Sequence, residues 1–184
     1  MNGRSDAFEI RVAGAEEAAL IEQMWAETST WLKGHGYDQW QYPADPSKVN
    51  RDVRSGNAFL VFRAGECLGT ISIDESADPE FWRAGDNPKD ALYVHRVIVR
   101  DSARGTSLGS AMLDWASGKA EIAGKKWLRL DAWKTNADLG RYYESQGFEH
   151  VRTVDLPHRN SGALYQRRAG EVRGAGPALI TVAP

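Results

Sequence analysis

Apolar side chains recur along this chain with two different periods that alternate from one stretch to the next. In Phe8-Glu9-Ile10-Arg11-Val12 every second residue is apolar, which is typical of a strand with one buried face. A period of two, or a β-branched run, predicts strands at 8–12, 58–63, 67–74, 92–99, 127–133, 148–156 and 163–168. Apolar residues at every third or fourth position predict helices at 16–33, 47–54, 107–123 and 136–146.

The order of these elements indicates the architecture. Helices interspersed among strands favour an α/β domain with a mixed sheet. No linker divides the first 169 residues, whereas residues 170–184 contain Gly, Pro and small side chains without a clear period. The sequence therefore predicts one domain at 1–169, followed by a flexible C-terminal tail at 170–184.

The most informative stretch lies between the strand at 92–99 and the helix at 107–123. The β-branched run Val97-Ile98-Val99 is followed by Arg104-Gly105-Thr106-Ser107-Leu108-Gly109-Ser110, where the helix begins. A helix N-terminus offers unpaired N–H groups and the positive end of the dipole, so it can hold a phosphate. Arg104 adds a guanidinium suited to phosphate. A plain strand-to-helix connection remains the alternative for this segment alone.

A second signature follows downstream. Asn136 is a good N-cap for the helix at 136–146, and Gly147 can end that helix. Tyr143 lies seven residues after Asn136, and Phe148 opens the next strand.

In order and spacing, the two signatures resemble those of the GNAT superfamily of acyl-CoA-dependent N-acyltransferases. Its phosphate turn has the form Arg/Gln-x-x-Gly-x-Gly/Ala, and only Ser107 departs from it, at the first glycine. The resemblance spans about Phe8 to Ala169. It implies the GNAT fold, with a mixed, mostly antiparallel central sheet flanked by helices. It also implies that the fourth and fifth strands splay apart and admit the pantetheine arm of the coenzyme.

The resemblance also implies acetyl-CoA as co-substrate and assigns residues to it. Val97, Ile98 and Val99 would offer backbone groups to pantetheine, and Asn136 would lie near it. The pyrophosphate turn and helix start would be Arg104, Gly105, Thr106, Ser107, Leu108, Gly109 and Ser110. Ser107 requires a backbone conformation that tolerates a Cβ atom.

Acetyl transfer benefits from a proton donor for the leaving thiolate and a base for the amine. The resemblance makes Tyr143 the general acid; the alternative is an aromatic residue packed under the sheet, a role that also suits Tyr142. His95 is the candidate base, because some arylalkylamine-type members of the family carry a histidine at this strand position. The alternative is a structural histidine.

Strand alternation refines the choice of base. It places Tyr93, His95, Val97 and Val99 on one face of the strand, and Val94, Arg96 and Ile98 on the other. The rival bases are Asp74, Glu75 and Asp131. For Asp131, an ion pair with Arg129 on the same strand face is the structural alternative.

The acceptor site is expected at two loops, 37–46 and 157–162, because in this fold they flank the acceptor. Trp40 and Tyr42 could form an aromatic wall, joined by Trp31 or Trp82. The charged candidates for reading the substrate are Asp38, Asp155, His158 and Arg159. Aromatic rings near a carboxylate would suit a cationic amine.

Composition narrows the function further. A formal net charge of −2 over 184 residues argues against a nucleic-acid-binding protein. Cys67 is the single cysteine, so an intrachain disulfide is excluded. Neither a signal peptide nor a membrane-spanning apolar run is visible, so we expect a cytoplasmic protein. The four histidines (His35, His95, His150 and His158) lack ligand spacing, and no metal site is predicted.

The favoured function is an N-acetyltransferase that moves an acetyl group from acetyl-CoA to a primary amine, preferably a small molecule, by direct attack in a ternary complex. The alternatives are a protein or peptide N-acetyltransferase and a non-catalytic acyl-CoA-binding sensor domain. The departure at Ser107 favours the sensor. A structural turn that binds no coenzyme is the remaining possibility. The sequence leaves a monomer and a homodimer equally open.

Overall fold

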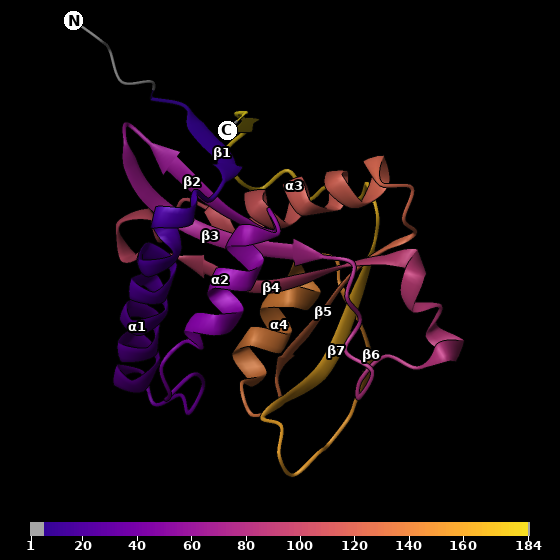
Figure 1. Ribbon diagram of the computed structural model, residues 1–184. Helices are drawn as coiled ribbons and strands as arrows, with labels where there is room; N and C mark the ends of the chain where they lie inside the picture. Colours follow the sequence, from indigo (N-terminus) through magenta and orange to yellow (C-terminus); the bar gives the residue numbers. More distant parts are fainter. Residues whose placement is uncertain (1–5, 184) are drawn as a thin grey trace, which may run out of the picture.

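The computed structural model describes residues 6–183 and contains one eight-stranded, mostly antiparallel sheet in the order β6-β7-β5-β4-β3-β2-β1-β8 (Figure 1). The strands are β1 (Phe8–Val12), β2 (Ala58–Arg63), β3 (Glu66–Asp74), β4 (Ala91–Val99), β5 (Trp127–Trp133), β6 (Glu149–Thr153), β7 (Ser161–Arg168) and β8 (Leu179–Thr181). The helices are α1 (Ala18–Gly34), α2 (Pro46–Arg54), α3 (Leu108–Ile122) and α4 (Ala137–Ser145). Short 3-10 turns lie at Ala15–Glu17, Ala84–Asp86, Pro88–Asp90 and Asp101–Ala103.

Two layers of helices cover the sheet. Buried residues of α3 and α4, such as Met112 and Tyr143, share one core cluster with Leu92 and Val94 of β4. Buried residues of α1 and α2 share a second cluster, which includes Ile98. The predicted order of strands and helices up to β7 is confirmed, and most ends shift by only one or two residues.

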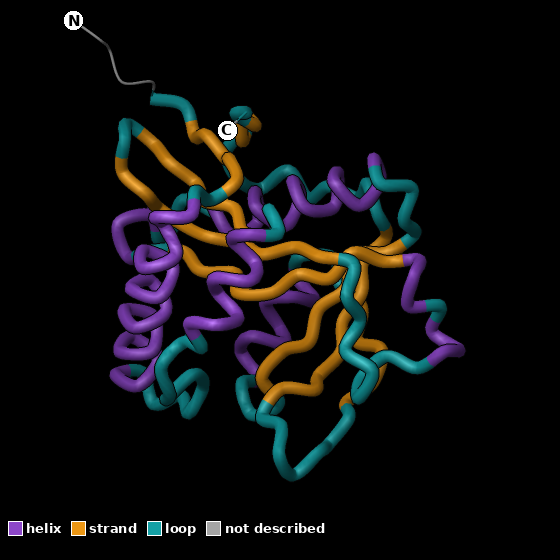
Figure 2. The backbone as a smooth tube through the Cα atoms, viewed as in Figure 1, coloured by secondary structure: helices purple, strands orange, loops and turns teal. Residues whose placement is uncertain are grey.

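The sheet is split at its centre. β4 and β5 are parallel but pair only at Ala91↔Trp127, Leu92↔Leu128 and Tyr93↔Arg129. Beyond these pairs β5 stays with β7 and β4 stays with β3, so the two strands diverge (Figure 2). The predicted splay of the fourth and fifth strands is confirmed, and it leaves the β5-facing edge of β4 without a strand partner from residue 94 onward.

The predicted alternation along β4 is wrong beyond His95, because a β-bulge interrupts the strand. Ser72 pairs with His95 and Thr70 with Ile98, so two residues of β4 oppose one residue of β3. Arg96 has a φ of 48°, which a non-glycine residue rarely adopts. Consequently Val97 and Val99 contact the core beneath α3 and do not share the face of His95.

The segment after β7 also differs from its prediction as a flexible tail. Residues 170–183, here called the C-terminal strap, run back along α3 and end in β8, which pairs in parallel with β1. The N–H of Gly170 donates to the carbonyl of Ser117 (3.0 Å), and Asp114 accepts from the N–H of Arg173 (3.0 Å). Such contacts depend on backbone groups and a carboxylate, so apolar periodicity could not reveal them.

Within residues 6–183, no helix is long and apolar enough to cross a membrane. In the same residues, no group of three or more His, Cys, Asp or Glu side chains is placed to hold a metal ion.

Candidate functional site

A cavity of about 1060 Å³ occupies the split in the sheet. Its walls come from both diverging strands, residues 94–97 of β4 and 130–133 of β5. On one face of the sheet, α4 contributes Leu139, Tyr142 and Tyr143. On the other face, α1, α2 and the loops after β3 and β6 close a chamber. The cavity therefore joins the two faces through the sheet.

The turn before α3 offers a set of unpaired donors. Within the described chain, the backbone N–H groups of Gly105 and of residues 107–110 have no protein acceptor, and no side chain caps α3. The hydroxyl of Ser110 is buried and also lacks a partner there. These orphaned donors at a helix N-terminus fit a phosphate.

Ser107 departs from glycine at a position where glycine would be favoured. Its φ of 58° lies in the left-handed region, which costs an L-residue roughly 1–2 kcal/mol. Since its backbone nevertheless adopts this conformation, the turn has the geometry that glycine would give it.

Trp31 lies beside this turn and also lines the main cavity, where it was expected as part of the acceptor wall. The Arg104 guanidinium, which forms an ion pair with Asp101, lies 3.6 Å from the centroid of the Trp31 ring. Both residues also line a second cavity of about 340 Å³ between α1 and residues 99–104. Trp31 thus borders both cavities, and it can serve the coenzyme as readily as the acceptor.

Asn136 fixes the entry to α4. Its Oδ1 accepts from the N–H of Leu139 (3.0 Å), and its Nδ2 donates to Oε1 of Gln39 in the loop after α1 (2.8 Å). The side chain is buried and borders the cavity. Asn136 therefore connects the two helical layers at the cavity wall.

Both adjacent tyrosines of α4 reach the cavity. Tyr143 is packed against Phe148 and Tyr165, and its hydroxyl has no hydrogen-bond partner within residues 6–183. Burial raises the pKa of Tyr143 and, to about 12, that of Tyr142. A Cβ atom on Gly109 would lie 2.6 Å from the Tyr142 hydroxyl, so Tyr142 packs on the start of α3. Both phenols are protonated near neutral pH and can donate a proton.

His95 forms a pair with Asp74. Nε2 of His95 lies 3.3 Å from Oδ2 of Asp74, and 34% of the His95 side chain is exposed. Burial lowers the pKa of His95, but the hydrogen bond and charge of Asp74, with the charge of Asp131, outweigh it and raise the pKa above its usual value. Because a carboxylate can only accept, the proton belongs on Nε2, which leaves the Nδ1 lone pair free.

The predicted ion pair between Asp131 and Arg129 is absent from the described residues. Arg129 donates instead to Oε1 of Gln166 (3.1 Å) and to the carbonyl of Asp86 (2.8 Å). Its guanidinium lies 4.6 Å from the centroid of Trp82. Asp131 remains in the cavity wall, among the residues that line it.

Trp82 does not line the cavity. It is only 4% exposed and packs with Phe81, Tyr93 and Leu164 in a third core cluster. Glu75 lies outside the cavity wall as well, where it pairs with Lys125 (3.3 Å).

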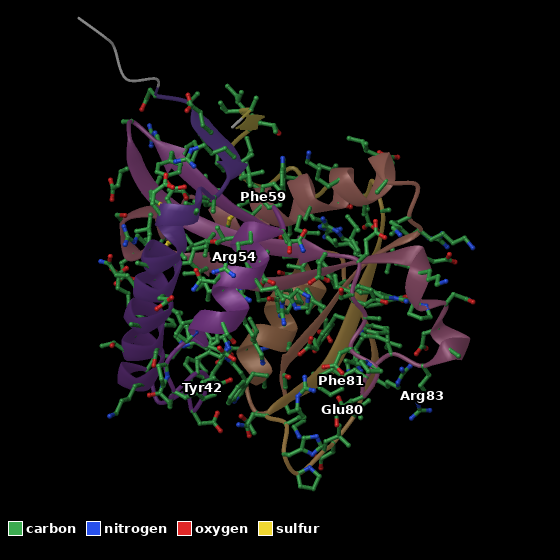
Figure 3. The ribbon with its side chains drawn as sticks, in the orientation of Figure 1. Tyr42, Arg54, Phe59, Glu80, Phe81 and Arg83 are labelled. Carbon is green, nitrogen blue, oxygen red and sulfur yellow. The ribbon has the colours of Figure 1, made fainter. Side chains whose placement is uncertain are left out.

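The aromatic wall of the chamber is larger than the sequence indicated. Trp25 stacks on Trp40 at 4.1 Å between ring centroids, and Tyr42 lies 6.2 Å from Trp133. Figure 3 labels Tyr42 in the loop below α2 and Glu80 in the β3–β4 loop. Trp25 had the spacing of a helix core face and Trp133 that of a strand, so nothing in their spacing marked them as cavity residues.

All four of the expected charged residues are engaged by other protein groups. Asp38 accepts from Nε1 of Trp133 (3.0 Å), and Asp155 accepts from Nζ of Lys134 (2.7 Å). His158 pairs with Glu80 (2.6 Å), while Arg159 pairs with Glu80 and also with Asp78 (2.7 Å). These last contacts join the β6–β7 loop to the β3–β4 loop and close one side of the chamber.

Comparison with known proteins identifies relatives of this arrangement. The family model described as Acetyltransferase (GNAT) family matches residues 18–148. The chain is 27% identical over 153 residues to the uncharacterized N-acetyltransferase YesJ of Bacillus subtilis, covering 80% of this chain and 84% of YesJ. It is 24% identical over 144 residues to the peptidyl-lysine N-acetyltransferase YiaC of Escherichia coli, covering 77% and 84%.

Solved structures share the fold. An acetyltransferase of the GNAT family from Listeria monocytogenes superposes with a TM-score of 0.74 at 25% identity, covering 88% of this chain and 94% of that one. The PaiA N-acetyltransferase of Thermoplasma acidophilum, solved with coenzyme A, gives a TM-score of 0.68 at 14% identity, covering 88% and 99%. The second likeness concerns the fold alone.

Proposed function

The chain belongs to the acetyltransferase (GNAT) family, and we propose that this acetyl-CoA-dependent N-acetyltransferase acts on the primary amine of a small molecule. The cavity through the split sheet carries the proposal. It joins the face of the sheet that α4 covers, on which we place the coenzyme, to a chamber with aromatic and carboxylate walls on the other face.

We assign the coenzyme-binding residues from the backbone and side-chain groups that have no hydrogen-bond partner in the described residues. The open edge of β4 at residues 97–99 offers backbone donors and acceptors to the pantetheine arm, and Asn136 borders the same space. The donors of Gly105 and residues 107–110 suit the pyrophosphate, with Arg104 beside them. Acetyl-CoA supplies an activated acetyl thioester, which its amine acceptor attacks.

The base and the acid lie on opposite faces of the split. Nδ1 of His95 takes the proton that the amine must lose, while Asp74 holds the ring through Nε2. As the N–C bond forms and the C–S bond breaks, the Tyr143 hydroxyl donates its proton to the departing sulfur. Each group thus moves one proton, and the acetyl group passes directly from sulfur to nitrogen.

A peptidyl-lysine acceptor is the second candidate, because the E. coli relative is a peptidyl-lysine N-acetyltransferase. A lysine side chain presents the same primary amine to the chamber. The two acceptors differ in whether a polypeptide must lie along the chamber mouth.

Release of the coenzyme thiol from acetyl-CoA, measured across a panel of small amines and a lysine peptide, tests the proposal. We expect turnover with small amines, and a decrease in kcat of about 10²–10⁴-fold in Tyr143→Phe and in His95→Gln, with unchanged coenzyme affinity. Tyr142→Phe is the matched control and should retain most of the activity.

Coenzyme binding without turnover of any amine would contradict the proposed enzymatic activity and indicate a non-catalytic acyl-CoA-binding sensor domain. Turnover of the peptide alone would favour the lysine acceptor. A fully active Tyr143→Phe would remove Tyr143 as the acid.

A further inference from the structure

Among the carboxylates of the cavity wall, Asp131 differs from the others because it has no hydrogen-bond or ion-pair partner within the described residues. The others have cationic or hydroxyl partners: Asp52 pairs with Arg96, Asp74 with His95, Asp78 with Arg159, and Asp138 with Tyr37 and Arg141. Within residues 6–183, the Asp131 carboxylate has neither a hydrogen bond nor an ion pair. An unpaired, partly buried carboxylate in a cavity is a position that a cation would stabilise.

The strand register places Asp131 opposite the proposed base. Tyr93↔Arg129 is the last pair that joins β4 to β5, and the Tyr93 hydroxyl lies 3.5 Å from Nη1 of Arg129 on one face of the sheet. Two residues further along each strand, His95 and Asp131 point to that same face. They therefore border the opening of the split from its two sides.

The surroundings of Asp131 favour an organic cation. Trp133 follows two residues later on the same face of β5 and lies beside Tyr42. Aromatic faces attract cations. Arg159 interacts with the charge of Asp131, but Asp78 and Glu80 already engage its guanidinium.

We infer that Asp131 binds the ammonium group of the acceptor, so that the enzyme selects amines that are cationic at neutral pH over neutral molecules of the same shape. The inference rests on the proposed function for the identity of the bound molecule as acceptor. The bound ammonium lies across the split from His95. It loses one proton to solvent before attack, and His95 takes the second proton as the N–C bond forms. Asp131 is thus a specificity residue, and His95 remains the base.

A binding measurement tests Asp131 without requiring turnover. Benzylamine, cationic at pH 7, and benzyl alcohol, neutral and of similar shape, serve as probes, and quenching of the cavity tryptophans reports their binding. We expect wild type to prefer benzylamine by roughly 10- to 100-fold. Asp131→Asn should lose that preference and leave benzyl alcohol binding unchanged. Asp138→Asn, which removes a paired carboxylate from the same cavity, should keep the preference.

Kinetics separate this inference from the proposed function. With any amine that is turned over, Asp131→Asn should raise KM roughly 10- to 100-fold and change kcat much less, because the contact binds the ground state. Unchanged KM and probe preference in an active enzyme would overturn the role of Asp131 alone. A preference that depends on Asp131 in a protein that acetylates no amine would retain the cation site and overturn the enzymatic proposal. Asp131→Ser repeats both measurements should the asparagine variant fail to fold.

Discussion

At the scale of single residues, the pairing of His95 with Asp74 sets the proton affinity of the proposed base. Asp74 raises the pKa of His95 against the opposing effect of burial. A raised pKa means that the neutral imidazole, the form that can accept a proton, predominates only at higher pH. The acidic limb of kcat/KM reports this ionisation in the free enzyme.

Replacing Asp74 by Asn removes the charge that raises the His95 pKa. We therefore expect Asp74→Asn to move the acidic limb of the kcat/KM profile to lower pH, with a reduced plateau because the ring is held less firmly. Glu75→Gln, which alters a carboxylate outside the cavity wall, should leave the profile unchanged. An acidic limb that stays in place in Asp74→Asn would mean that another group is the base.

At the scale of elements, α3 is tied to both β7 and the C-terminal strap through one carboxylate. Asp114 accepts from Nη1 of Arg167 (3.1 Å) and from the backbone N–H groups of Arg173 and Gly174. Arg167 is 1% exposed, and burial lowers its pKa. The guanidinium also donates to the carbonyls of Leu113 (2.7 Å) and Gln146 (2.8 Å), so Asp114 supplies the counter-charge and backbone carbonyls supply the other acceptors.

Removing this carboxylate leaves a buried cation without a counter-ion. We expect Asp114→Ala to reduce the free energy of unfolding by about 3–5 kcal/mol, measured by urea denaturation at pH 7. Glu121→Ala, which removes an exposed carboxylate from the same helix, should change it by less than about 0.5 kcal/mol. Equal effects of the two substitutions would show that Asp114 does not hold the strap and β7 to α3.

At the scale of the whole molecule, the sheet consists of two halves joined by three residue pairs between β4 and β5. A ligand that fills the split contacts both halves, so it binds the native state and stabilises it. Binding only to the native state adds about 2.7 kcal/mol at a ligand concentration of 100 Kd.

Acetyl-CoA at that concentration should raise the Tm by roughly 5–10 °C in a chain of this size. Arg104→Glu, which places a negative charge beside the phosphate turn, should abolish most of the increase in a thermal melt. Wild type that melts at the same temperature with and without acetyl-CoA would indicate that Ser107 marks a degenerate coenzyme site.

Local patterns determined much of this fold. The period of apolar residues predicted the strands and helices because each element buries one face, and this requirement acts over a few residues. The glycines of the phosphate turn and the cap at Asn136 followed from backbone rules of equally short range. These two signatures also indicated the family, and the split sheet followed from the family resemblance.

Only the tertiary structure decided which side chains meet. The bulge at Arg96 reverses the faces of Val97 and Val99, because one extra residue in a strand shifts every later side chain. Trp82, in the loop between β3 and β4, entered a core cluster, whereas Trp25, on the core face of α1, also lines the cavity. Asp131 lost its predicted partner when Arg129 found acceptors on β7 and on the β3–β4 loop. These outcomes depend on contacts between residues far apart in sequence, and the spacing of neighbouring side chains carries no information about such contacts.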